Sequence, residues 1–320
     1  MNSEKDFFLA VILGPTAVGK TELSLRIADS LKAEIISADS MQVYREMDIG
    51  TAKAGSSVRR EIPHHMLDII SPEEEFSVAE YQKQVDKLIP EIYSREHLPL
   101  MVGGTGLYIR AVTEGFMLPD MDKDKKLREK LKQKASQNGN KAVHQKLAEI
   151  DPELAEKLHP NDLRRVIRGI EIYRQTGRTK TYFRKKQEDR PPRYKYIKFG
   201  LTRPREELYN RINKRVDKMM ESGLEKEVRF LYENYSLSKT ALQAVGYKEL
   251  IKYFTGDCDK EEAIRLIKRN TRHLAKKQLT WFKRDPDIIW FNVSQKDSSA
   301  IKDEIIEKIK KKSSLDFLEY

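Results

Sequence analysis

Residues 14–21 read Gly14-Pro15-Thr16-Ala17-Val18-Gly19-Lys20-Thr21, which fits the phosphate-loop pattern G-x-x-x-x-G-K-[ST]. The apolar run 7–13 predicts a buried strand before the loop, and the apolar periodicity of 21–31 predicts a helix after it. The glycines let successive N–H groups surround phosphate oxygens, Lys20 adds a positive charge, and the helix dipole favours an anion. The chain is therefore predicted to hold a di- or triphosphate. The loop alone does not distinguish ATP from another phosphate, and a chance glycine-rich turn is the alternative.

The alternation of strand and helix continues beyond the loop. Apolar runs at 33–37 and 98–102 predict two more strands, which lead into Asp39-Ser40 and into the glycines of 103–106. Ligand-type residues at the carboxyl ends of successive strands are typical of a parallel sheet in an α/β protein. The expected fold class is therefore α/β, with a P-loop NTPase-like parallel sheet flanked by helices.

Two later runs of strand type, 196–202 and 288–293, are expected to return to the same sheet. The residues between the third and fourth strands then form an insertion. We expect a catalytic core made of 1–113 and 200–320 with C-terminal helices, and an inserted, mainly helical domain over 114–199.

The net charge of +11 is concentrated in that insertion. Residues 121–200 contain 23 Lys and Arg against 11 Asp and Glu, a net of +12, whereas the remaining residues contain 38 against 39. A concentrated basic region is typical of a polyanion binder, most often of nucleic acid, because each neutralised phosphate releases counterions. The stretch 265–284 has eight Lys and Arg and no acid, and fits an RNA backbone equally well. For the lysine-rich piece 123–134, a solvated helix face is an equally supported interpretation.

The composition, with 39% apolar and 35% charged residues, is that of a globular protein. No run approaches the roughly 18 apolar residues that a membrane helix needs. Residues 1–6 lack the basic and apolar segments of a signal peptide. We therefore expect a cytoplasmic protein that has no membrane contact. We also expect it to act as a monomer.

Asp39 is the first candidate for chemistry, because a carboxylate after the second strand lies beside the phosphate loop in this fold class. Such a carboxylate can bind Mg²⁺ or act as a general base, and capping of local backbone is the structural alternative. The third strand runs straight into glycines and has no acidic residue. The absence of a Walker-B aspartate at that place argues against an ATP-driven motor.

Three further groups of residues have two interpretations each. Arg211 and Arg215 share a helix face, and their forked donors suit a diphosphate, although Arg215 could instead lie along apolar surface with its head in water. Phosphate contact and ordinary exposure are comparably supported for the arginines of 164–168. The pair His64-His65 suggests a metal, but no Cys/His cluster surrounds it, so a zinc site is not expected.

Several other stretches of the chain form, together with the phosphate loop, one set of sequence motifs. They are Ile36-Ser37-Ala38-Asp39-Ser40-Met41-Gln42-Val43-Tyr44-Arg45, Met47-Asp48-Ile49-Gly50-Thr51-Ala52-Lys53, Gly103-Gly104-Thr105-Gly106-Leu107-Tyr108, Arg164-Arg165-Val166-Ile167-Arg168, Gly246-Tyr247-Lys248-Glu249, and Thr271-Arg272 with Lys276-Lys277-Gln278-Leu279-Thr280-Trp281. Together they resemble the tRNA dimethylallyltransferases, also called tRNA isopentenyltransferases. The match follows the family order over almost the whole chain, and its one departure is the conservative Lys248, where some members resemble arginine.

The resemblance implies transfer of a dimethylallyl group from dimethylallyl diphosphate to N6 of the adenosine 3′-adjacent to the anticodon, in tRNAs that read codons beginning with U. The phosphate loop would then hold the diphosphate of the donor instead of ATP, which accounts for the missing Walker-B acid. The implied partners are the tRNA anticodon stem-loop and dimethylallyl diphosphate, and the implied cofactor is Mg²⁺.

The resemblance also assigns roles to residues. Asp39, Thr21 and Arg215 would be catalytic, with Asp39 as the base and Thr21 as the Mg²⁺ ligand. The diphosphate would be held by Gly14, Pro15, Thr16, Ala17, Val18, Gly19, Lys20, Thr21 and Arg211. The tRNA would be contacted by Asp39, Ser40, Met41, Gln42, Thr105, Arg164, Arg165, Arg168, Gln243, Gly246, Tyr247 and Lys248. The near-helical spacing of the basic residues in 265–284 adds Arg272 and Lys276 as candidate contacts with the RNA backbone.

Two other functions compete with this interpretation. An ATP-dependent small-molecule kinase would share the loop and the α/β core, but it has no need for the basic insertion. A non-catalytic RNA-binding module would explain the insertion, but it leaves the phosphate loop and Asp39 without a role.

Overall fold

The computed structural model describes residues 7–117, 119 and 121–313, so residues 1–6, which bear on the signal-peptide prediction, lie outside it. The chain forms two compact units. Unit 1 consists of Met1–Thr113 and Tyr194–Tyr320, and unit 2 of Glu114–Arg193. The insertion was predicted to end at residue 199. Unit 2 ends earlier because strand β5 already begins at Lys195 and pairs with β1 from Phe8 onward.

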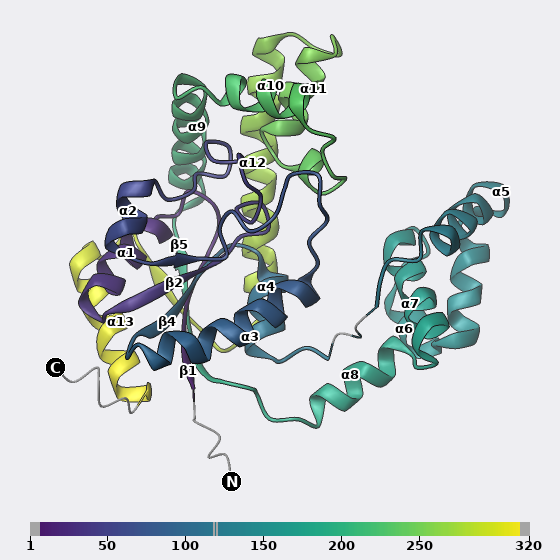
Figure 1. The fold of residues 1–320 in the computed structure, drawn as a ribbon, viewed down its shortest axis with the longest axis horizontal. Coiled ribbons are helices and arrows are strands. Elements are labelled where there is room, and N and C mark those ends of the chain that lie inside the picture. The colour runs from purple at the N-terminus through teal and green to yellow at the C-terminus, as the bar shows by residue number, and fades with distance from the viewer. Residues whose placement is uncertain (1–6, 118, 120, 314–320) are drawn as a thin grey trace. The chain divides into compact units, whose positions relative to one another are not determined.

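Unit 1 is built on a six-stranded sheet with the order β3-β2-β4-β1-β5-β6 (Figure 1). All neighbouring strands are parallel. The strands are β1 (Phe8–Leu13), β2 (Ala33–Ala38), β3 (His64–His65), β4 (Leu98–Gly103), β5 (Lys195–Thr202) and β6 (Ile288–Asn292). Every residue of β1 and β2 is buried. β1 reads as a continuous apolar run, whereas β2 is mostly apolar and also contains the buried Glu34 and Ser37. The predicted fold class is confirmed.

The helices of unit 1 follow the strands. They are α1 (Lys20–Ser30), α2 (Ser56–Glu61), α3 (Val78–Ser94), α4 (Gly106–Thr113), α9 (Arg205–Glu221), α10 (Leu224–Asn234), the 3₁₀ turn η1 (Ala241–Gln243), α11 (Tyr247–Phe254), α12 (Lys260–Phe282) and α13 (Ser298–Ser313). None of the described helices is long and apolar enough to cross a membrane.

Two hydrophobic cores lie on the two faces of the sheet. Alternate residues of β1, Phe8, Ala10 and Ile12, pack against α1, α13 and the start of α9. The intervening residues, Leu9 and Val11, pack against α3 and α4. Because side chains alternate across a strand, one buried strand supplies both cores and the sheet is covered on both sides.

A third core joins the far end of α9 to α10, α11 and α12. Val216 and Leu224 pack there with Val43, Tyr44 and Met47, which belong to the segment after β2. This cluster places the loop that follows Asp39 against the helices that carry the C-terminal motifs.

The paired histidines form the edge strand β3. His65 bonds to the buried carboxylate of Glu34 at 2.6 Å, and His97 and Arg95 bond to the same carboxylate. Among the described residues, no group of three or more His, Cys, Asp and Glu could hold a metal ion. His65 thus contributes to the fold through its hydrogen bond to Glu34.

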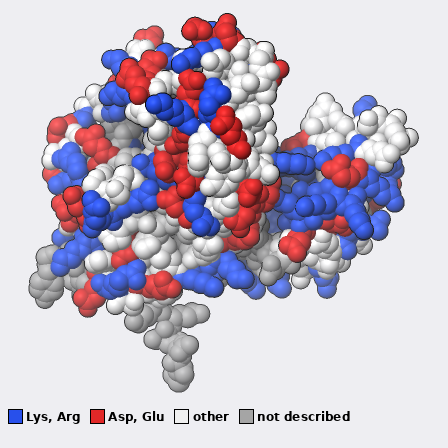
Figure 2. Space-filling model, turned by 45° about the horizontal axis from the view of Figure 1, so that its top comes forward, with Lys and Arg blue, Asp and Glu red and all other residues white. Residues whose placement is uncertain are grey.

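Unit 2 is a bundle of four helices, α5 (Lys125–Ile150), α6 (Pro152–Lys157), α7 (Leu163–Thr176) and α8 (Lys180–Glu188). α5 contains a break at Gly139, which has φ 78° and ψ 159°. The unit has its own apolar core between α5 and α7, to which Val143, Leu147, Val166 and Ile170 contribute. Figure 2 shows Lys and Arg gathered on the visible face of this unit.

Candidate active site

The phosphate loop joins β1 to α1 through backbone conformations that favour glycine. Gly14 has φ 152° and Gly19 has φ 114°, both in the region that other residues rarely adopt. Gly14 also passes so close to β5 that an added Cβ would lie 2.7 Å from the Leu201 carbonyl oxygen. Gly19 precedes α1 without a side-chain cap, so N–H groups of the first helical turn remain available to an anion.

Lys20 is held inside the curve of the loop. Its Nζ donates to the carbonyl oxygens of Gly14 at 3.0 Å and Pro15 at 2.8 Å. Burial, together with the nearby Arg215 guanidinium, lowers the pKa of Lys20 to about 7, against a smaller opposing effect of Asp39. Two cations held close together in a desolvated place favour an anionic ligand that would restore the ordinary charge of the lysine.

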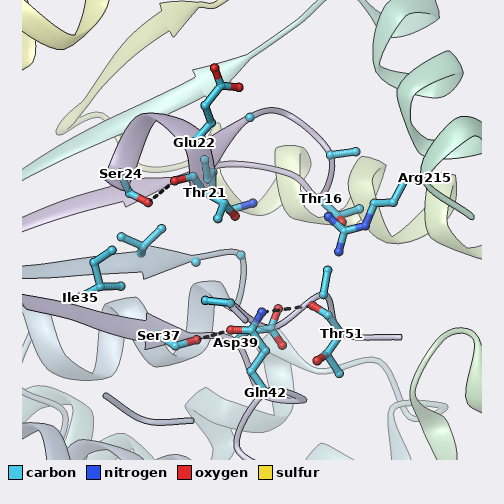
Figure 3. A pocket seen from close by; sticks show the side chains of 18 of the residues that line it. Thr16, Thr21, Glu22, Ser24, Ile35, Ser37, Asp39, Gln42, Thr51 and Arg215 are labelled. Carbon is cyan, nitrogen blue, oxygen red and sulfur yellow. Dashed lines mark hydrogen bonds between the residues drawn. The ribbon is translucent and has the colours of Figure 1, made fainter. Parts of the chain in front are cut away.

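A cavity of about 460 Å³ opens beside the loop. Figure 3 shows Thr21 at the start of α1 on one side, Asp39 and Thr51 across from it, and Arg215 reaching in from α9. The lining includes Thr16, Ala17, Gly19, Lys20, Thr21, Asp39, Arg211 and Arg215. The structure thus brings together the loop, the candidate base and both predicted arginines.

The two arginines of α9 differ in what they contact. Arg211 is exposed, and its Nε donates to the Ala17 carbonyl oxygen at 2.9 Å, which ties α9 to the phosphate loop. Arg215 points into the cavity (Figure 3), and its pKa is lowered by burial despite the nearby Asp39. The guanidinium of Arg215 therefore faces the site and is not directed along an apolar surface toward water.

Asp39 lies just beyond the end of β2 and is half-buried. Its Oδ1 accepts a hydrogen bond from Met41 N at 2.9 Å, so the carboxylate does shape the local turn. Among the described residues, the other oxygen, Oδ2, has no hydrogen-bond partner. One oxygen is therefore used to hold the side chain in place, and the other is free to accept a proton.

A second cavity, of about 100 Å³, adjoins the first. The two cavities share Thr16, Asp39, Thr51, Arg215 and Gln278. The rest of the second cavity is largely apolar, with Val216, Met219, Leu224 and Val245 in its wall. Asp39 and Arg215 thus stand where a phosphate-binding space meets an apolar one.

Some of the predicted tRNA contacts of unit 1 line this second cavity, and several have partners within the protein. Met41, Gly246 and Tyr247 line it. The Tyr247 hydroxyl donates to Glu227 at 2.6 Å, and burial raises the pKa of that hydroxyl. Both ends of the Gln42 amide are also bonded internally, to Ser37 and to the Thr51 carbonyl. Thr105 accepts from Ser40 N at 3.0 Å.

The remaining predicted contacts lie on helix surfaces. In unit 1, Gln243 and Lys276 are exposed, Lys248 lies 3.7 Å from Glu249, and Arg272 donates to Asn213. These positions are compatible with contact to RNA, and the assignments stay predictions.

In unit 2, the three predicted arginines of α7 have different surroundings. Arg164 and Arg165 are exposed, and Arg165 lies 3.4 Å from Asp162. Arg168 is paired at 2.6 Å with the buried Glu171, which also binds Arg128. The tRNA-contact assignments of these arginines stay predictions.

Sequence reasoning missed several residues of the first cavity. Lys214 and Lys218 lie on the same face of α9 as Arg211 and Arg215, a repeat that helical spacing could have indicated. Gln278 lines both cavities and had no role assigned, because nothing local connects it with residues near the N-terminus. Arg203 precedes α9, and its Nε donates to the Val18 carbonyl oxygen in the phosphate loop.

The fold and the loop define a P-loop α/β protein with an inserted helical unit. A family model described as IPP transferase matches residues 42–285, and one described as isopentenyl transferase matches residues 8–64. A curated relative named tRNA dimethylallyltransferase, from Halothermothrix orenii, is 62% identical over 97% of this chain and 93% of its own length. Another of that name, from Natranaerobius thermophilus, is 46% identical over 95% of this chain and 92% of its own.

Solved structures agree with these matches. A tRNA isopentenylpyrophosphate transferase from Bacillus halodurans is 44% identical with a TM-score of 0.71, covering 97% of this chain and 99% of that one. A eukaryotic dimethylallyltransferase described as acting on tRNA is 29% identical with a TM-score of 0.79, covering 96% of this chain and 80% of that one. The chain therefore belongs to the IPP transferase family, whose matched curated members are tRNA dimethylallyltransferases. The resemblance inferred from the motifs is confirmed.

Proposed function

We propose that this enzyme transfers the dimethylallyl group of dimethylallyl diphosphate to N6 of the adenosine 3′-adjacent to the anticodon, in tRNAs that read codons beginning with U. Membership of the family supports the transfer to tRNA. The observation that carries the proposal is the position of Asp39 and Arg215, which border both the phosphate-binding cavity and the apolar one. A donor with one charged and one apolar end, and an acceptor base beside it, suit such a pair of spaces.

The first cavity is suited to the diphosphate of the donor. Lys20, Arg211 and Arg215 line it together with the start of α1, and all three cations face the space where negative charge grows as the diphosphate leaves. Lys214 and Lys218 line it as well and add to the positive potential. Lys20 and Arg211 are held by loop carbonyl oxygens before the reaction begins, and such preorganisation is the condition for effective electrostatic stabilisation of a transition state.

Asp39 is suited to activate the acceptor. The adenine amino group is a weak nucleophile because its lone pair is delocalised into the ring, so removal of its proton assists attack. The N6 lone pair forms the new bond to C1 of the donor, the C1–O bond breaks, and the N6 proton passes to the carboxylate of Asp39. The oxygen without a partner, Oδ2, is the one placed to accept it.

The residues present fit the predicted Mg²⁺. This ion keeps several waters and is usually held by one or two protein groups together with substrate phosphates, so a cage of protein ligands is not required. Thr21, at the start of α1 and in the wall of the first cavity, is the proposed ligand. When bound there with the donor, Mg²⁺ would neutralise part of the charge on the departing diphosphate.

The tRNA is proposed to be held through its phosphates by the basic residues of unit 2 and of α12. Counted over 114–193, unit 2 has 21 Lys and Arg against 13 Asp and Glu, a net of +8. The target base would be extruded from the anticodon loop, at a cost of a few kcal/mol, toward the second cavity. The enzyme is proposed to act as a cytoplasmic monomer.

The test is prenyl transfer itself. The protein is incubated with labelled dimethylallyl diphosphate, Mg²⁺ and unmodified tRNA whose anticodon ends in A, and the label is located by nuclease digestion. Label on the adenosine beside the anticodon supports the proposal. Release of phosphate from ATP without any label would favour a kinase instead.

The role of Asp39 is tested in the same assay. Asp39→Asn removes the basic oxygen while keeping the shape of the side chain, so we expect transfer to fall by at least about 10²-fold while tRNA binding is retained. Asp257→Asn, which changes an exposed carboxylate in the turn between α11 and α12, is the matched control. Unchanged transfer by Asp39→Asn would remove Asp39 as the base.

A further inference from the structure

We propose that Gln278 is a positioning residue that fixes the donor side of the site relative to the acceptor side. This inference rests on the function proposed above. Gln278 lies on α12, and its side chain lines both the phosphate-binding cavity and the apolar cavity. It shares that position with Thr16, Thr51 and the two residues assigned to the chemistry, Asp39 and Arg215.

Both ends of the Gln278 amide are bonded to backbone. Oε1 accepts from Thr16 N in the phosphate loop at 2.9 Å, and Nε2 donates to the Gly104 carbonyl oxygen, just after β4, at 3.1 Å. The opposite orientation of the amide would set an NH₂ group against the Thr16 N–H and a carbonyl oxygen against the Gly104 carbonyl oxygen. Since both of those contacts repel, the two partners hold the amide in one orientation.

The approach of α12 to the turn after β4 is close enough that a side chain at Gly106 would meet the Trp281 ring and one at Gly104 would displace the Gln278 amide. A Cβ added to Gly104 would lie 2.2 Å from Gln278 Nε2, and one added to Gly106 would lie 2.3 Å from the Trp281 ring. Gln278 and Trp281 are three residues apart on α12, so they share a face and press on this turn together. Any shift of the helix would therefore move the turn or break the two hydrogen bonds.

The bonds of Gln278 determine where Thr16 lies. Because the Thr16 N–H is bound to Gln278, it is not one of the loop donors left for the diphosphate. Thr16 itself lines both cavities, and Figure 3 shows it near Arg215. One amide side chain thus sets the distance between the loop that holds the donor and the strand ends that carry the acceptor machinery.

This arrangement predicts a loss of rate without a matching loss of binding. Reacting atoms must meet within a few tenths of an ångström, and a displacement of about 1 Å can cost about 10²-fold in rate. Gln278→Met keeps the length of the side chain and removes both hydrogen bonds. We expect single-turnover transfer at saturating substrates to fall by roughly 10- to 100-fold, with the dissociation constants for donor and tRNA changed by less than about threefold.

Two further variants separate positioning from general damage. Thr280→Ala removes an exposed hydroxyl on the same helix, which bonds only to the Lys276 carbonyl oxygen, and should leave transfer unchanged. In Gly104→Ala the new methyl group displaces the intact Gln278 amide from the turn after β4. This variant should show the same loss of rate, and it replaces Gln278→Met in the assay if that variant is too unstable. The double variant Gln278→Met with Gly104→Ala should lose less rate than the product of the two separate fold-losses, because both changes remove the same contact.

The outcomes distinguish this inference from the proposed function. If the unaltered protein transfers no label to tRNA, the proposed function fails. If it transfers label and Gln278→Met does so at the same rate, the positioning role is refuted. The role is also refuted if excess donor restores the full rate to Gln278→Met, because the residue would then serve only to bind the donor.

Discussion

The residues of the site bring positive charge together at some cost to the fold. Lys20 is enclosed by the carbonyl oxygens of its own loop, and the Arg215 guanidinium lies near it. The carboxylate of Asp39 partly offsets the effect of burial on the pKa of both cations. Like charges in a desolvated place destabilise the protein until an anion binds. Such strain is common at functional sites, where substitutions can improve stability while they abolish activity.

Lys20→Met tests this cost through its dependence on pH. The pKa of Lys20 is about 7 in the folded protein and 10.5 in an ordinary setting. Between these values the unfolded chain holds a proton that the folded protein lacks, so the stability contributed by this group rises with pH across the window. Below about pH 7 the folded protein carries the charged, buried ammonium of Lys20, so the whole destabilisation by this group is present. We therefore expect Lys20→Met to raise Tm, and to do so more at about pH 6 than at about pH 9.

The matched control is Lys218→Met, which alters an exposed lysine of the same cavity. Its effect on Tm at the two pH values is the baseline for the effect of Lys20→Met. Inorganic pyrophosphate should raise the Tm of the parent and leave that of Lys20→Met almost unchanged. An equal Tm difference between Lys20→Met and the parent at both pH values would contradict the assignment of the strain to this ammonium.

Local pattern explains which single residues could be predicted. Lys20 and Thr21 belong to a contiguous motif, Asp39 follows a strand, and Arg211 and Arg215 share a helix face, so each is visible within a few positions of sequence. Gln278 could not be found in this way. Its hydrogen bond to Thr16 spans 262 positions, and a glutamine in a helix carries no sign of which distant backbone it will meet.

At the scale of elements, the central strands were predicted to within one residue at each end because parallel strands buried on both faces are mostly apolar, even where a polar residue such as Glu34 interrupts the run. The two-residue strand β3 was missed, since its histidines are neither apolar nor part of a longer run. The segment 47–54 forms neither a helix nor a strand, so no periodicity of apolar residues could have indicated its position. It nevertheless supplies Thr51 to both cavities.

That segment is held by one carboxylate of α10. Glu227 Oε2 accepts from the N–H groups of Asp48 and Ile49, and Oε1 accepts from Gly50 N at 3.1 Å and from the Tyr247 hydroxyl. Four donors on one side chain fix the loop against α10 and α11. The acceptor wall of the second cavity therefore depends on a residue that does not line it.

Glu227→Gln tests that dependence. An amide can offer only one oxygen, so its NH₂ group would face N–H or O–H donors and leave at least one of them without an acceptor. We expect a loss of roughly 2–4 kcal/mol in the free energy of unfolding, measured by urea denaturation, together with slower transfer. Glu233→Gln, on the exposed side of the same helix and 4.0 Å from Arg229, should change stability by less than about 0.5 kcal/mol. Equal effects of the two changes would contradict this account of the loop.

At the scale of the whole molecule, the uneven distribution of charge was visible in the sequence, but the availability of each charge was not. Arg168 is neutralised by Glu171, and Glu153 binds Lys157, Arg184 and Lys185, so several basic residues of unit 2 already have acidic partners. Arg164 is exposed and, within the described part of the chain, has no acidic partner within 4.0 Å. Composition counts these arginines equally, whereas only the folded unit shows which of them is free.

Arg164→Ala should therefore weaken tRNA binding in a manner that depends on salt. A free guanidinium that contacts one phosphate releases about one counterion on binding, so its loss should reduce the slope of log affinity against log salt by about 1. The measurement is a titration of unmodified tRNA at several salt concentrations, with Lys310→Ala on the exposed side of α13 as the control. Arg168→Ala is expected to reduce the slope less than Arg164→Ala, because Arg168 is already paired and its removal mainly disturbs Glu171. If Arg164→Ala and Lys310→Ala leave identical slopes, then α7 does not contact the phosphates, and the basic face of unit 2 would need another partner.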